Sequence, residues 1–139
     1  MLDAPTTIQP ARPLSVPRLL LTILACQAAG GIGAVATARS IDDWYVGLDK
    51  PAFNPPNTIF GPVWTLLYAM MALAFDLYSR QAADRGTLRL GQGLFGAQLA
   101  LNTLWSLLFF GLRSPLAALV EIVFLWVAIV LTTVVFARL

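Results

Sequence analysis

Residues 19–38 read LLLTILACQAAGGIGAVATA, a run without a charged side chain that lies between Arg18 and Arg39. A transmembrane helix needs about 20 predominantly apolar residues to cross the hydrocarbon core of a bilayer. The run also lacks the two-residue alternation that is typical of a strand in a membrane β-barrel. This stretch therefore predicts a membrane-spanning helix and decides the fold class of the chain.

Three further apolar runs of similar length follow, broken only by Asp76 and Glu121 and closed by Arg138. Together the four runs predict an all-α, polytopic membrane helix bundle with transmembrane helices at about residues 19–38, 60–79, 90–112 and 114–138. The first run is longer than the 7–15 apolar residues of a signal peptide, and a polar leader precedes it. We expect a transmembrane domain over residues 18–139.

The leader, residues 1–17, is rich in proline, with Pro5, Pro10, Pro13 and Pro17. Proline at that spacing forbids a continuous helix, so the sequence predicts a flexible tail. Basic residues indicate the topology of the spans. One side of the membrane would carry Arg12, Arg18, Arg80, Arg85, Arg89 and Arg138, and the other would carry Arg39, Lys50 and Arg113. This bias favours a multi-pass protein with a cytoplasmic N-terminus.

The overall composition excludes several classes of function. The 139 residues are 58% hydrophobic and 12% charged, about half the charge of a soluble domain. The net charge of +2 is too small to indicate a nucleic-acid partner. Histidine is absent and Cys26 is the single cysteine, which excludes a histidine-based triad, a histidine-ligated zinc site and an internal disulfide. We expect no catalytic residue set and no metal site.

The longest connection, residues 39–59, combines prolines with aromatic side chains. Pro51, Pro55 and Pro56 predict a stiff, extended loop, and Pro62 is expected in the first turn of the second helix. The aromatic residues here include Trp44, Tyr45 and Phe53. They fit either a belt at the depth of the lipid headgroups or a lid that packs across the end of the helix bundle. The proline stiffness favours the lid.

Two predicted helices carry stripes of polar and aromatic residues at helical spacing. One stripe contains Gln98, Asn102, Trp105 and Phe109, and the other contains Trp64, Tyr68, Met71 and Phe75. An amide in hydrocarbon must find a partner, so Gln98 and Asn102 are expected to face the interior of the bundle. Their role is either to form hydrogen bonds between helices or to orient a ligand in an aromatic pocket.

The remaining polar and small residues inside the spans leave alternatives open. Glu121 is the acid placed well inside a span, and it is either functional or paired with a neighbour such as Arg113. Gly30, Gly31 and Gly33 lie in the first helix, where small residues allow helices to approach closely. We expect packing to be their role, either within the bundle or at a dimer interface.

Taken together, the loop and the two stripes form an ordered pattern. It reads WY at residues 44–45, LDKPAFNPP at 48–56, FGPVW at 60–64, QLALN at 98–102, Trp105, and FFG at 109–111. This pattern resembles the TspO/MBR family, the tryptophan-rich sensory proteins related to the mitochondrial translocator protein. The resemblance extends in order from Ile41 to about Glu121, where an acid in the fourth helix is usual in the family.

The resemblance implies a five-helix membrane bundle, commonly a homodimer, with a ligand pocket beneath the loop between the first two helices. Family members resemble receptors for porphyrins, above all protoporphyrin IX, and mitochondrial relatives bind cholesterol and benzodiazepine-type drugs. By position, the resemblance makes pocket walls of Trp64, Asn102 and Trp105, and lid residues of Tyr45, Phe53 and Pro55. Tyr68 and Gln98, from the two stripes, are further candidates for ligand binding. The family's fifth helix is absent from this sequence, which suggests either a fragment or a four-helix variant with an opened pocket.

The expected function is therefore a membrane receptor or sensor for protoporphyrin IX or a haem-like tetrapyrrole, with membrane lipids or sterols as further partners. The resemblance also implies an alternative, the light- and oxygen-dependent breakdown of the porphyrin that some bacterial members promote. A second alternative is a small multidrug-type exporter. Such exporters depend on an acid in the first helix, and residues 19–38 contain none.

Overall fold

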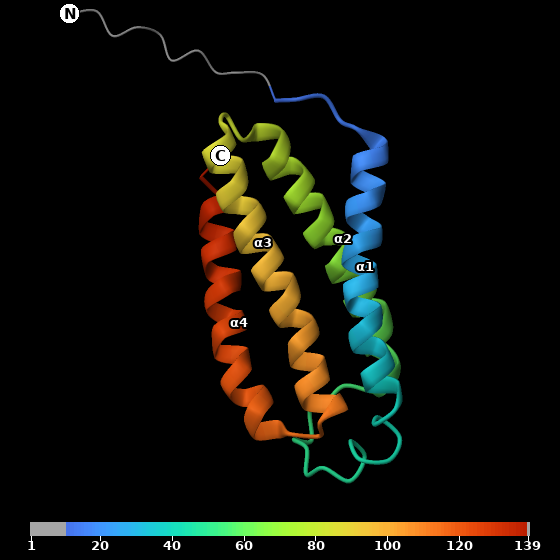
Figure 1. Ribbon diagram of the computed structural model, residues 1–139. Coiled ribbons are helices and arrows are strands. Elements are labelled where there is room, and N and C mark those ends of the chain that lie inside the picture. The colour runs from blue at the N-terminus through green and yellow to red at the C-terminus, as the bar shows by residue number, and fades with distance from the viewer. Residues whose placement is uncertain (1–10, 139) are drawn as a thin grey trace, which may run out of the picture.

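The computed structural model describes residues 11–138, which form an all-helical bundle (Figure 1). Its long helices are α1 (Val16–Ala38), α2 (Asn57–Gln81), α3 (Arg85–Ser106) and α4 (Pro115–Phe136). A π-helical turn, η1 (Leu107–Gly111), continues α3. Each long helix is long and apolar enough to cross a membrane. The prediction of an all-α bundle with four membrane-spanning helices is confirmed.

The helix starts differ from the sequence-based bounds. Helix α1 already begins at Val16, and Pro17 lies in its first turn, where a missing backbone N–H costs nothing. Residues 11–15 are non-helical, and the rest of the predicted tail, residues 1–10, lies outside the described residues. Helix α2 begins at Asn57, so the expected position of Pro62 in the first turn is wrong. The helix starts directly after Pro56, which places Pro62 inside it.

The described helices surround one central element. Helix α3 packs against α1, α2 and α4, whereas α1 and α4 do not touch and α2 meets α4 only sparsely (Figure 1). The buried core gathers where α1, α2 and α3 meet and contains Cys26, Tyr68, Ala72 and Phe95. Helix α3 therefore lies at the centre of the described bundle.

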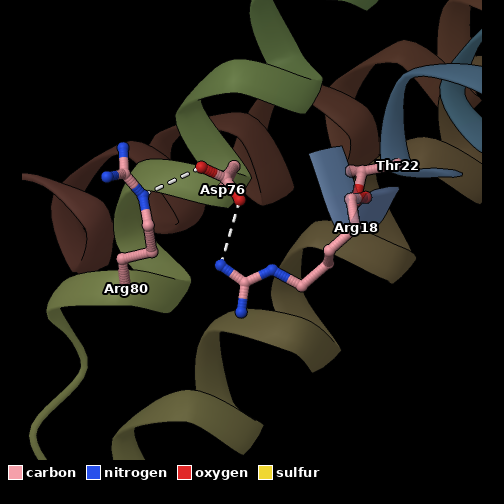
Figure 2. Close-up of polar contacts among 4 residues, drawn as sticks. All are labelled: Arg18, Thr22, Asp76 and Arg80. Atoms are coloured by element: carbon pink, nitrogen blue, oxygen red, sulfur yellow. Dashed lines mark hydrogen bonds and ion pairs between the residues drawn. The ribbon is translucent and has the colours of Figure 1, made fainter. Parts of the chain in front are cut away.

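A buried acid joins the start of α1 to the end of α2 (Figure 2). The Asp76 side chain is only 3% exposed, and its Oδ1 accepts a hydrogen bond of 3.0 Å from Arg18 Nη2. Arg80 Nε lies 2.9 Å from Asp76 Oδ2, within ion-pair distance but outside hydrogen-bond geometry. Both carboxylate oxygens are thereby engaged. Asp76 thus fastens the end of the bundle that lies opposite the α1–α2 connection.

The connection between α1 and α2, residues 39–56, crosses the other end of the bundle (Figure 1). We call it the lid. The expectation of an extended loop is wrong for residues 39–48, which coil into consecutive turns. The Tyr45 N–H donates to Ser40 O, and the Leu48 N–H donates to Tyr45 O. This half contains no proline, so its amides are free to form turns, and only the second half has the proline-rich character of the prediction.

Candidate ligand-binding site

Aromatic side chains hold the lid on the end of α3 and η1. The Trp44 ring lies 5.2 Å from the Phe109 ring in an edge-on arrangement, and the Tyr45 ring lies 5.6 Å from that of Phe110. Trp105 stacks on Phe109 at 5.0 Å between ring centroids. Such pairs contribute about 0.5–1.5 kcal/mol each beyond the burial of their area. These contacts support the interpretation of the connection as a lid, which the sequence placed at residues 39–59 and which ends at residue 56 in the structure.

Lys50 organises the lid from within. Its Nζ donates hydrogen bonds to the carbonyl oxygens of Tyr45, Leu48 and Val46 at 2.6, 3.0 and 3.3 Å. An ammonium group has three donors, so this set uses all of them. The Nζ also lies 4.6 Å from the centre of the Tyr45 ring, a cation–π distance. The Tyr45 hydroxyl in turn donates to Asn54 Oδ1, which ties the two halves of the lid together.

An exposed ion pair fastens the lid to the turn before α4. Arg113 Nη2 donates to Asp43 Oδ2 at 2.9 Å. A hydrogen bond from the Trp44 backbone N–H, and next the Arg113 guanidinium, hold the pKa of Asp43 below its ordinary value. Because the pKa of Asp43 is lowered in the folded state, its ion pair with Arg113 stabilises the lid at pH values above the ordinary pKa of aspartate. The stabilisation is lost as the pH falls through the lowered value.

We predict that Lys50→Met loosens the lid without unfolding the helices. The three carbonyl groups lose their shared donor, so the turns should open about tenfold more often. Hydrogen–deuterium exchange of the Tyr45 and Leu48 amides measures this opening. Lys50→Arg, which retains the charge, should exchange at a rate between those of the wild type and the methionine variant. Unchanged exchange in Lys50→Met would show that the aromatic contacts alone hold the lid.

A cavity of about 610 Å³ lies between α2, α3 and α4. We call it the inner cleft. Its volume falls within the range of about 300–1,000 Å³ that is usual for small-molecule sites. The wall is mostly apolar with a few polar groups, and its characteristic residues are Met71, Phe95, Phe136, Gln98, Tyr78 and Thr132. Such a wall suits a large apolar ligand that a small number of hydrogen bonds orient.

The two predicted amides on α3 face inward, as expected. Gln98 and Asn102 are both buried, and Gln98 lines the inner cleft. Asn102 lies one helical turn closer to the lid. Among the described residues, neither side-chain amide forms a hydrogen bond with another residue, although Gln27 on α1 does so with the Thr65 carbonyl. Neither amide therefore joins two described helices by a hydrogen bond, and Gln98 is available to a ligand in the inner cleft.

The other predicted site residues are distributed over three places. Trp64 is 39% exposed on α2 and lies 5.9 Å from the ring of Tyr68, which points into the core. Trp105 and Tyr45 belong to the aromatic contacts beneath the lid. Phe53 is 88% exposed and Pro55 is exposed as well, so these two lie on the outside of the lid. The inner cleft itself does not extend to Trp64, Asn102 or Trp105.

Sequence reasoning missed the part of the cleft that α4 supplies. Thr132 and Phe136 line the cleft, and the Phe136 ring stacks on that of Tyr78 at 4.2 Å. The sequence signal for Thr132 as a cleft residue was weak, because the hydroxyl of a threonine in a membrane helix can also bond to a backbone carbonyl of the same helix. Here Thr132 Oγ1 donates to Ala128 O. The stacking partner of Phe136 lies almost sixty positions away in the sequence, so no local pattern reveals it.

Glu121 is buried on α4, with a relative exposure of 6%. Its carboxylate oxygens have no hydrogen-bond partner among residues 11–138. The suggested pairing with Arg113 is wrong, because Arg113 bonds to Asp43 instead. Over the same residues, no group of three histidine, cysteine, aspartate or glutamate side chains lies close enough together to hold a metal ion.

Comparison of the sequence with known proteins finds a matching family model and several similar proteins. The sequence model of the TspO/MBR family matches residues 22–139. The chain is 44% identical to the tryptophan-rich protein TspO of Archaeoglobus fulgidus, over 87% of this chain and 78% of that protein. It is also 44% identical to the protein of that name from Chlorobaculum tepidum, over 86% and 76% of the two chains. The Homo sapiens translocator protein is 38% identical, over 66% and 54%.

Proposed function

Because the chain belongs to the TspO/MBR family and is an integral membrane protein, we propose that it is a receptor that binds porphyrins in the inner cleft. The observation that carries the proposal is the buried side-chain amide of Gln98, which makes no hydrogen bond within the described chain and lies in the apolar, aromatic wall of the inner cleft. A flat macrocycle of the protoporphyrin IX type combines a large apolar surface with polar pyrrole and carboxylate groups. Both features match this wall.

The cleft provides a distinct surface for each part of such a ligand. Phe95 and Phe136 present aromatic rings, and Met71 supplies a flexible side chain that adapts to irregular shapes. Gln98 offers both a donor and an acceptor to a polar group of the macrocycle.

We predict that protoporphyrin IX quenches the tryptophan fluorescence of the detergent-solubilised chain in a saturable manner when titrated in the dark. Gln98→Leu should weaken the affinity about five- to tenfold, since it removes a hydrogen bond to the ligand while retaining the size of the side chain. The dissociation constants from the titrations measure this effect.

The matched control is Gln92→Leu, because Gln92 is an exposed amide on the same helix, α3. Its affinity should equal that of the wild type. Trp126→Phe tests the origin of the quenching, because Trp126 is an exposed tryptophan on α4 and should contribute little to the saturable signal. Quenching that never saturates, or an equal loss of affinity in Gln92→Leu and Gln98→Leu, would contradict binding in the inner cleft.

A further inference from the structure

A second cavity, of about 540 Å³, lies between α1 and η1 at the lid end of the bundle. We call it the interfacial groove. It shares no lining residue with the inner cleft. On α1 its wall is formed by Ile32, Val35 and Ala36, which are spaced so that they share one face of the helix, and Arg39 follows directly after the helix. Ile32 and Val35 are each more than half exposed, so this wall is apolar and accessible.

Small residues form the floor of the groove. A methyl group placed on Gly111 would lie 3.8 Å from the Cβ of Ala36, which is ordinary van der Waals contact. The opposite wall comes from Leu107 and Phe110 of η1. A channel of this composition accommodates a hydrocarbon chain, and it has the volume of a small-molecule site.

Two guanidinium groups stand at the end of this channel. Arg39 lines the groove and has no ion-pair or hydrogen-bond partner for its side chain among residues 11–138. Arg113 also lines it and uses only one of its donors, on Asp43. Its backbone φ of 52° is rare for a residue other than glycine. The Arg39 guanidinium therefore stands beside an apolar channel without a described partner.

The position of the arginines matches the depth of lipid headgroups. Arg39 directly follows the last residue of α1, and Arg113 lies in the short turn between η1 and α4. Both therefore stand at the end of membrane-spanning helices, where the hydrocarbon core gives way to the headgroup region. The apolar wall formed by Ile32 and Val35 continues from there toward the middle of the membrane.

We propose that the interfacial groove binds an anionic glycerophospholipid, with its phosphate held between Arg39 and Arg113 and an acyl chain lying between α1 and η1. Charge complementarity supports this occupant, because the Arg39 guanidinium lines the groove and has no anionic partner among the described residues. Guanidinium groups bind phosphate oxygens through charge-assisted hydrogen bonds. The site is separate from the inner cleft, so the lipid and the porphyrin do not compete.

The test is a titration of the purified full chain in neutral detergent with phosphatidylglycerol, followed by native mass spectrometry. Arg39→Gln should weaken lipid binding about tenfold, the loss expected for one charged contact. Arg89→Gln serves as the matched control, because Arg89 is an exposed arginine at the other end of α3, and it should leave binding unchanged. Gly111→Leu, which fills the channel but keeps both arginines, should also abolish lipid retention.

Two ligands separate the contributions of the headgroup and the acyl chain. Diacylglycerol, which lacks the phosphate, and glycerol 3-phosphate, which lacks the chains, should each bind at least tenfold more weakly than phosphatidylglycerol. Equal binding of diacylglycerol, or full competition by glycerol 3-phosphate, would overturn the proposal. So would an effect of Arg39→Gln on the balance of monomer and dimer without any effect on lipid, because the groove would then be an interface between copies. Circular dichroism identifies any variant that fails to fold, and Arg39→Gln alone then carries the test.

Discussion

Asp76→Ala is expected to lower the free energy of unfolding by about 3 kcal/mol, at the lower end of the range for breaking a buried ion pair. The carboxylate is almost fully buried and meets Arg18 and Arg80 with its two oxygens (Figure 2). Its removal leaves Arg80, which is only 21% exposed, without compensation for its charge. Arg18 is 42% exposed and reaches solvent, which keeps the expected loss from being larger.

Unfolding in mixed micelles of a neutral detergent and SDS measures this loss. Arg18→Ala should cost about 1 kcal/mol or less, because its charge is partly solvated. Asp49→Ala is the control for removing an acid, since Asp49 is exposed and outside every described ion pair. The double variant Asp76→Ala/Arg80→Met should recover part of the stability, because no uncompensated charge is left at Arg80. An Asp76→Ala variant as stable as the wild type would contradict this account.

Gly91→Ala is expected to lower the free energy of unfolding by about 1–3 kcal/mol and to weaken porphyrin binding. A Cβ atom at this position would lie 2.0 Å from Cε1 of the Tyr78 ring. That ring is buried and stacks on Phe136, and the Tyr78 hydroxyl donates to Thr87 O. Tyr78 can therefore move away only by giving up this stacking or this hydrogen bond. Its displacement would disturb the cleft wall that Tyr78 and Phe136 form together.

Gly93→Ala provides the matched control on the same helix. A Cβ at Gly93 meets no atom within 4 Å, so the change gains helix propensity of about 0.5–1 kcal/mol without a clash. The two variants are thus expected to shift stability in opposite directions in the same unfolding assay. Equal shifts would mean that α2 and α3 do not approach as closely as the structure has them. The porphyrin titration then reports separately whether the cleft wall has changed.

The inward orientation of Gln98 and Asn102 was predictable, because an amide in a membrane span avoids lipid whatever the neighbouring helices are. The same reasoning could not place the aromatic residues, since an aromatic ring is compatible with lipid, with the core and with the interface. Phe53 and Tyr45 belong to one loop motif, yet Phe53 is exposed and Tyr45 is buried. The inner cleft and the interfacial groove likewise depend on residues that three or more elements bring together.

The sequence by itself determined the number of spans, their approximate ends and the position of the lid. Each of these follows from the transfer of one local segment from water to lipid, which depends on composition alone. Only the tertiary structure decided that Arg113 meets Asp43, that Arg18 meets Asp76, and that Phe136 meets Tyr78. The physical reason is that most faces of these helices are apolar and suit lipid equally well. The rotation of each helix about its axis, and its register against its neighbours, are then set by contacts between residues that are distant in the sequence. The pattern within one helix does not determine them.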